Sequence, residues 1–232
     1  MPLIDSNTNK KILVVAAHPD DEVLGCGGTI SRHVDNGDEV HVVFMSDGVS
    51  SREIKEYDDE IQYRKESAVS SSGILGVESV IFLGFPDNRM DTLAMLDIVK
   101  QLEEVFNNIN PSVVYTHFYG DLNIDHRITY QAVMTVCRPL PGQTVKEIYI
   151  FEIPSSTGWL SQSQESTFCP NRFIDISNMI DRKMKALNAY KKEMRKFPHF
   201  RSTKGIKLMA QLRGVSVGIS AAESFMVVRQ II

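Results

Sequence analysis

The sequence predicts an α/β domain, a three-layer sandwich in which helices cover both faces of a mainly parallel sheet. Two observations lead to this prediction. Short apolar runs rich in β-branched residues recur between residues 12 and 116, and segments with helical spacing of apolar residues separate them. Parallel strands are buried on both faces and therefore read as continuous apolar runs. Right-handed strand–helix–strand crossovers then place helices on both sides of the sheet.

The first part of the chain supplies four such units in order. The expected strands are 12–17, 40–45, 80–83 and 113–116, and the expected helices are 22–36, 59–75, 92–108 and 126–137. Asp91 and Asp125 stand where the N-caps of the last two helices should be, and Asn110-Pro111 ends the third helix.

The remainder of the chain is less regular. We expect a strand at 147–153, a polar surface loop at 155–167 that contains Trp159, a long amphipathic helix at 181–196 and a last strand at 225–228. Because no repeat, low-complexity tract or linker interrupts the pattern, residues 1–232 are predicted to form a single domain.

Composition and charge exclude several classes of function. The 232 residues are 43% apolar and 23% charged, with a formal net charge of −4. This charge gives no general attraction for nucleic acid or for an anionic membrane. The polar segment 1–11 lacks the apolar core of a signal peptide, and no apolar run has the length of a membrane span, so we expect a cytoplasmic protein. A homo-oligomer is compatible with the sequence.

Cysteines and the basic residues near the C-terminus have ordinary structural interpretations. Cys26, Cys137 and Cys169 form no CxxC pair and are expected to be buried free thiols in a reducing compartment. The basic residues between Lys183 and Lys196 are expected to form the solvated face of a helix.

Residues with the chemistry of a metal site follow the first predicted strand. In an open α/β sheet, ligands bind at the carboxyl ends of the strands, which here lead into loops 18–21, 46–58, 84–91 and 117–125. His18 and Asp21 are three residues apart across a strand-to-helix turn, so both can reach one ion, and imidazole and carboxylate are good zinc ligands. Asp20 points elsewhere in such a turn and could serve as the base that hydrolysis requires.

A third metal ligand must come from another loop. Segment 117–126 holds the densest remaining group of His, Asp and Asn residues, and it offers both His126 and His117. His126 falls at the start of a predicted helix, and His117 lies closer to the end of the preceding strand. The other histidines, His33, His41 and His199, are expected to be structural.

A dinucleotide-binding protein is a competing interpretation, because glycines follow the first strand. The dinucleotide fingerprint needs those glycines in the strand-to-helix turn itself. Here residues 18–24 intervene, and Gly25, Gly27 and Gly28 fall inside the predicted helix. The placement therefore argues against dinucleotide binding and for close helix packing.

Three motifs stand out along the chain: His18-Pro-Asp-Asp-Glu followed by Gly25-Cys-Gly-Gly, a segment ending in Asp125-His126, and Ala222-Glu223-Ser-Phe225. Together they resemble the LmbE/PIG-L family, whose members are zinc-dependent N-acetylglucosaminyl deacetylases and related amidases with a Rossmann-like fold. The resemblance implies one LmbE-like deacetylase domain over residues 1–232 that removes the acetyl group from an N-acetylated amino sugar or sugar conjugate.

The resemblance also implies roles for individual residues. His18, Asp21 and His126 would bind Zn²⁺, and Asp20 would be the catalytic base. Asp87, Arg64 and, more weakly, Arg52 would contact the sugar substrate. Many members carry a histidine three residues before the last zinc ligand, where this chain has Asn123. An amide can donate a hydrogen bond to an oxyanion but cannot protonate a leaving amine, so acid and base duties would both fall to Asp20, or His117 would assist.

Two alternatives to an N-deacetylase stay open within this family. One is a sugar- or nucleotide-binding module of the same fold without catalytic activity, suggested by the missing histidine at position 123. The other is an amidase that acts on an amide conjugate other than an acetamide.

Overall fold

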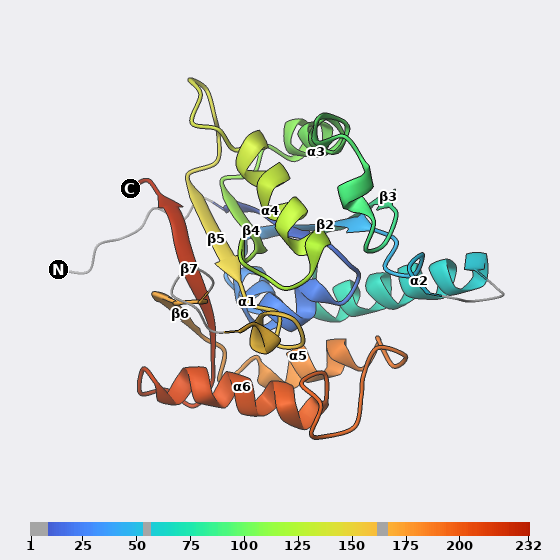
Figure 1. Ribbon diagram of the computed structural model, residues 1–232. Helices are drawn as coiled ribbons and strands as arrows, with labels where there is room; N and C mark the ends of the chain where they lie inside the picture. The colour runs from blue at the N-terminus through green and yellow to red at the C-terminus, as the bar shows by residue number, and fades with distance from the viewer. Residues whose placement is uncertain (1–8, 53–56, 162–166) are drawn as a thin grey trace.

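A computed structural model describes residues 9–52, 57–161 and 167–232. Within these ranges the chain forms a seven-stranded sheet in the order β3-β2-β1-β4-β5-β7-β6 (Figure 1). The strands are β1 (Lys11–Ala16), β2 (Glu39–Ser46), β3 (Ser79–Phe85), β4 (Val113–His117), β5 (Glu147–Phe151), β6 (Arg172–Asp175) and β7 (Ala222–Gln230).

Strands β1 to β5 pair in parallel, and β7 runs antiparallel to both β5 and β6. The predicted mainly parallel sheet is thus confirmed, with an antiparallel edge added by the C-terminal part of the chain. Parallel pairing places the carboxyl ends of β1, β2, β3 and β4 along one rim of the sheet, where the loops to the following helices lie.

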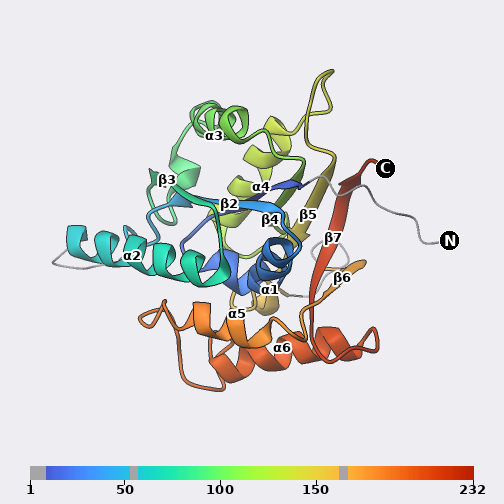
Figure 2. The ribbon, with the colours of Figure 1, turned by 180° about the vertical axis from the view of Figure 1, so that it is seen from behind.

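Helices cover both faces of the sheet (Figures 1 and 2). They are α1 (Asp21–Asp35), α2 (Tyr57–Leu75), α3 (Met95–Ile109), α4 (Ile124–Val136), α5 (Ile180–Leu187) and α6 (Thr203–Val215), with short 3₁₀ turns at Met90–Thr92 and Thr157–Trp159. Side chains alternate along β1: Ile12 and Val14 join the core with α1, α2 and α5, and Leu13 and Val15 join the core with α3 and α4. Burial of β1 on both sides explains its continuous apolar run.

Helix α1 packs unusually close to its neighbours because it carries glycines. A Cβ atom on Gly25 would lie 2.4 Å from the ring of Phe151, and one on Gly28 would lie 2.7 Å from the side chain of Ile176. These glycines lie inside the helix, as the sequence predicted, and they serve packing.

The predicted helix at 181–196 is wrong in its second half. Helix α5 ends at Leu187, and turns follow. Tyr190 and Glu193 are buried, where Tyr190 donates to Oε1 of Glu22 at 2.7 Å and Glu193 is ion-paired with Arg64. These tertiary contacts replace the continued helix. Strand β6 and helix α6 were not predicted.

Two further expectations need correction. Cys26 and Cys137 are buried free thiols, but Cys169 is exposed. Lys183 does not lie on a solvated helix face, because only 3% of its side chain is exposed and it pairs with Glu223. No helix in the described ranges combines the length and apolar character needed to cross a membrane. The predicted loop at 155–167 falls partly outside the described residues.

Candidate active site

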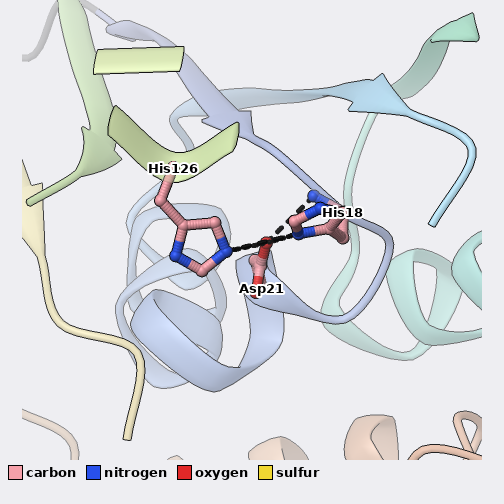
Figure 3. Close-up of side chains that lie close together, drawn as sticks. All are labelled: His18, Asp21 and His126. Carbon is pink, nitrogen blue, oxygen red and sulfur yellow. Dashed lines mark hydrogen bonds and ion pairs between the residues drawn. The ribbon is translucent and has the colours of Figure 1, made fainter. Parts of the chain in front are cut away.

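Three predicted ligands meet at the rim where β1 and β4 end (Figure 3). His18 and Asp21 come from the β1–α1 turn, and His126 comes from the first turn of α4. Oδ2 of Asp21 lies 3.1 Å from Nδ1 of His18 and 3.2 Å from Nε2 of His126, and the two ring nitrogens are 3.2 Å apart. All three residues are buried.

The spacing of these donor atoms fits a tetrahedral ion. Zinc binds histidine nitrogen and carboxylate oxygen at about 2.0–2.2 Å, so two ligand atoms on a tetrahedron lie about 3.3 Å apart. The three distances between the donor atoms here, 3.1, 3.2 and 3.2 Å, are close to this tetrahedral spacing. The set also leaves a fourth position free, as a catalytic zinc site requires. His18, Asp21 and His126 could therefore hold a zinc ion without rearrangement.

In each histidine, the ring nitrogen that does not face the other two proposed ligands lies next to carboxylates. Nε2 of His18 lies 3.1 Å from Oδ1 of Asp87 and 3.1 Å from Oδ2 of Asp125, and Nδ1 of His126 lies 3.1 Å from Oδ1 of Asp121. Such partners fix the ring orientation and the tautomer of a metal-binding histidine, so that the other nitrogen presents its lone pair.

The field of these carboxylates favours positive charge at the cluster. Burial opposes protonation of His126, but Asp21 and Asp121 outweigh it and raise the pKa of this imidazole to about 9. The pKa of His18 is likewise raised by Asp125, Asp21 and Asp87 against the effect of burial. A divalent cation would satisfy the same field in place of these protons.

Asp20 lies next to the cluster with one carboxylate oxygen held and the other free. Oδ2 is ion-paired with Nη2 of Arg64 at 3.3 Å and accepts a hydrogen bond from Nη1 of Arg201 at 3.1 Å. Oδ1 is buried and has no hydrogen-bond partner among the described residues. Burial raises the pKa of this carboxyl, and Arg201 and Arg64 oppose the rise. A buried, unpartnered carboxylate oxygen is suited to accept a proton.

The backbone of Asp20 is held in an uncommon conformation. Its φ of 129° lies in the region that favours glycine, and Oε2 of Glu22 accepts the Asp20 N–H at 3.0 Å. This carboxyl is itself fully buried, and burial raises the pKa of Glu22 to about 8. The turn is thereby fixed with Asp20 and Asp21 pointing to different partners, as the sequence analysis expected.

His117, the alternative third ligand, accepts a hydrogen bond from the backbone. Nε2 of His117 accepts the N–H of Ala17 at 2.8 Å, so its lone pair is not available to an ion at the cluster. Its ring stacks on that of His126 with centroids 4.0 Å apart. His117 is thus placed as a structural neighbour of His126.

Asn123 is the N-cap of α4. Its Oδ1 accepts the N–H of Asp125 at 2.8 Å, and its Nδ2 donates to Oδ1 of Asn88 at 3.0 Å. The remaining amide hydrogen is the part of this side chain that could meet a substrate.

The predicted substrate-binding residues have different surroundings. Asp87 faces His18 and also accepts a hydrogen bond from Ser51 at 2.5 Å. Arg64 is buried, with 5% of its side chain exposed, against Asp20 and Glu193. Arg52 is partly exposed and donates to Glu193 at 2.9 Å. Of the three, Arg52 is the most accessible to a substrate.

Sequence reasoning missed Glu193 and Arg201. Glu193 is buried among Arg52, Arg64 and Arg201, and Arg201 contacts Asp20. Neither residue belongs to a motif, and Glu193 was hidden inside a predicted amphipathic helix. No local signal marks them, because Arg52 lies more than a hundred residues before Glu193, and Asp20 lies more than a hundred residues before Arg201.

Comparison with known proteins shows one family over the region that carries the cluster. The family described as "PIG-L: GlcNAc-PI de-N-acetylase" matches residues 13–137. An uncharacterized deacetylase, YaiS, from Escherichia coli K12 is 36% identical over 164 residues, which cover 68% of this chain and 81% of that protein. A 4-oxalmesaconate hydratase from Pseudomonas putida is 28% identical over 195 residues, 77% of this chain and 72% of its own length.

A solved structure has the same fold over nearly the whole chain. The N,N'-diacetylchitobiose deacetylase from Pyrococcus horikoshii superimposes with a TM-score of 0.77 at 22% identity, covering 95% of this chain and 84% of that one.

Proposed function

This chain belongs to the PIG-L family, and on that premise we propose that it is a zinc-dependent hydrolase that removes the acetyl group from an N-acetylated amino sugar or sugar conjugate. The observation that carries the proposal is the buried group of His18, Asp21 and His126, with tetrahedral spacing, beside the free Oδ1 of Asp20.

The proposed chemistry divides between the ion and the chain's own residues. A zinc ion held by His18, Asp21 and His126 would lower the pKa of a bound water toward about 7 and polarise the acetamide carbonyl. Oδ1 of Asp20 accepts a proton from the attacking water and later delivers it to the departing amine. One carboxyl can serve as base and then as acid because the two transfers occur in sequence.

Asn123 contributes to this scheme as a neutral donor. Asn88 leaves one of its amide hydrogens free among the described residues, and that N–H is assigned to the oxyanion that forms when water adds to the carbonyl. Because an amide cannot protonate an amine, Asp20 carries the whole proton transfer.

The substrate class is proposed from the names of the relatives. These include a diacetylchitobiose deacetylase from Thermococcus kodakarensis and a probable N-acetyl-alpha-D-glucosaminyl L-malate deacetylase from Bacillus cereus. We assign Arg52 and Asp87 to contacts with substrate hydroxyls, and Arg64, which is buried, to the support of Asp20.

A hydratase is the second candidate, because the Pseudomonas putida relative bears that name. Hydration of a carbon–carbon double bond and hydrolysis of an amide both need an activated water and a proton-transfer group, so the cluster alone serves either reaction. The two differ in product: only the hydrolase releases acetate and a primary amine.

The test is a substrate panel with the purified, zinc-loaded protein. Free, nucleotide-linked, lipid-linked and thiol-conjugated N-acetylated amino sugars are each incubated with wild-type protein and with Asp20→Asn, and acetate and primary amine are measured together. Equal release of both products by the wild type alone supports the proposal. Stoichiometric zinc without acetate from any acetamide would overturn it, and turnover of an unsaturated dicarboxylate would then favour the hydratase.

A further inference from the structure

Arg201 reaches the proposed base from a part of the chain that the family match does not cover. It lies just before α6, in the connection from α5, and this connection runs beneath α2 in both ribbon views (Figures 1 and 2). Its Nη1 donates to Oδ2 of Asp20 at 3.1 Å. We propose that Arg201 is a positioning residue that orients Asp20 for proton transfer, an inference that rests on the proposed function of this site.

The guanidinium of Arg201 is itself held on two sides. Its Nε donates to Oγ of Ser155 at 2.7 Å, and its Nη1 lies 3.6 Å from Oε2 of Glu193. A planar guanidinium fixed at two nitrogens has little freedom to rotate. The orientation of Arg201 is therefore set before any substrate binds.

The two guanidinium groups that contact one carboxylate oxygen of Asp20 leave the other oxygen to accept the proton. Arg64 and Arg201 both contact Oδ2, whereas Oδ1, although buried, has no hydrogen-bond partner in the part of the chain that the structure describes. If Arg201 were removed, Arg64 alone at 3.3 Å would hold Oδ2, and the carboxylate could rotate away from the attacking water. Displacement of a reacting group by about 1 Å can cost a hundredfold in rate.

Arg201 and Arg64 differ in what else they support. Arg64 is 5% exposed and is part of the buried core of the network, so its removal would disturb folding. Arg201 is 26% exposed, and it ties the Ser155 segment to the β1–α1 turn at the rim. Arg201 is therefore the partner of Asp20 that can be changed with the fold kept.

The experiment compares Arg201→Ala and Arg201→Lys with Arg195→Ala. Arg195 lies on the same connection but donates to the backbone carbonyls of Lys192 and Met194 and does not contact Asp20. We expect Arg201→Ala to lower kcat about tenfold to a hundredfold with KM nearly unchanged, because orientation of the base matters in the transition state. Arg201→Lys should recover part of the loss, and Arg195→Ala should behave as wild type.

Two readouts separate positioning from a purely structural role. Guanidinium chloride at low millimolar concentration should restore activity to Arg201→Ala, and tetramethylammonium chloride should not. The double variant Asp20→Asn/Arg201→Ala should have a kcat less than about twofold below that of Asp20→Asn alone, because the effects of residues that act through one another are not additive. Absence of guanidinium rescue together with additive losses would overturn the proposal.

A structural comparison tests the role of Arg201 without any substrate. Crystal structures of the wild type and Arg201→Ala should differ in the side-chain orientation of Asp20, and the same orientation in both would contradict the role of Arg201. If the wild type hydrolysed no acetamide, the proposed function would fail, but this pair of structures would still decide the inference on Arg201.

Discussion

Nζ of Lys183 lies 2.6 Å from Oε1 of Glu223, and this buried ion pair spans the break in helix α1. The helix is interrupted at Cys26, whose φ of −145° and ψ of 23° are not helical. Lys183 donates to the carbonyl of Leu24 before the break, and Glu223 accepts the N–H groups of Gly28 and Thr29 after it. The ion pair thus satisfies backbone groups that the interrupted helix leaves open.

Replacing Glu223 by Gln should therefore be strongly destabilising. Lys183 would be left buried without a counter-charge, and removing one partner of a buried pair typically costs about 3–5 kcal/mol. Urea denaturation measures the change in the free energy of unfolding. Asp35→Asn is the matched control, because the Arg182–Asp35 pair is more than a third exposed and should contribute at most about 1 kcal/mol. Equal effects of the two substitutions would contradict this account.

Substitutions of the proposed ligands and of the proposed base should have different effects on zinc content. Asp20→Asn should keep stoichiometric zinc and reduce turnover at least about a hundredfold, because the base is lost and the ligands stay. His126→Ala should lose zinc during purification. His117→Gln should retain it, since the lone pair of Nε2 of His117 already accepts the N–H of Ala17. Loss of zinc from Asp20→Asn would make Asp20 a ligand and refute its assignment as base.

The β1–α1 turn could be predicted from sequence because its chemistry is local. A His and an Asp three residues apart at the exit of a buried strand already define a direction for both side chains, and the structure brings them within 3.1 Å. Residue spacing alone left the third ligand open between His126 and His117, and only the family resemblance indicated His126. The contact that distinguishes them, in which His117 accepts the N–H of Ala17 just after β1, spans a hundred residues and leaves no signal in the local sequence.

The C-terminal part was predictable only in outline, for a physical reason. Glu193 reads as a charged residue on an amphipathic helix, and only the three-dimensional convergence of Arg52, Arg64 and Arg201 explains why it is buried. The helical pattern at 181–196 ends early for the same reason, because inward contacts outweigh propensity that is worth less than about 1 kcal/mol per residue.

Acid should destabilise the protein partly through Glu193. Burial disfavours its charged form, but Arg64 and Arg52 more than compensate and lower its pKa from 4.5 to about 2. A group with a depressed pKa stabilises the fold above its unfolded-state pKa and loses that contribution as the pH falls through the folded value. We expect about 3 kcal/mol from Glu193 to be present above pH 5 and lost between about pH 4.5 and pH 2.

Urea denaturation across this pH range checks the contribution of Glu193. The stability of Glu193→Gln should fall less steeply with acid than that of the wild type, whereas Glu104→Gln, a change at an exposed carboxylate on α3, should leave the slope unchanged. Parallel pH profiles for the wild type and Glu193→Gln would show that the arginine cluster does not depress this pKa.

Asp87 offers a test of whether a residue assigned to the substrate also serves the metal. Its Oδ1 lies 3.1 Å from Nε2 of His18, the nitrogen that faces away from Asp21 and His126, and its other oxygen accepts from Ser51. Loss of such an outer partner typically weakens metal affinity about 10–100-fold. Asp87→Asn should therefore lower zinc affinity in a chelator competition assay, and Asp91→Asn, at an exposed carboxylate in the same segment, should not. A rise in KM with unchanged zinc affinity would instead limit the role of Asp87 to contact with the sugar substrate.

Because Asp125 contacts the same nitrogen of His18, Asp87→Asn should weaken zinc binding without abolishing it, and zinc affinity should fall further when Asp125→Asn is added.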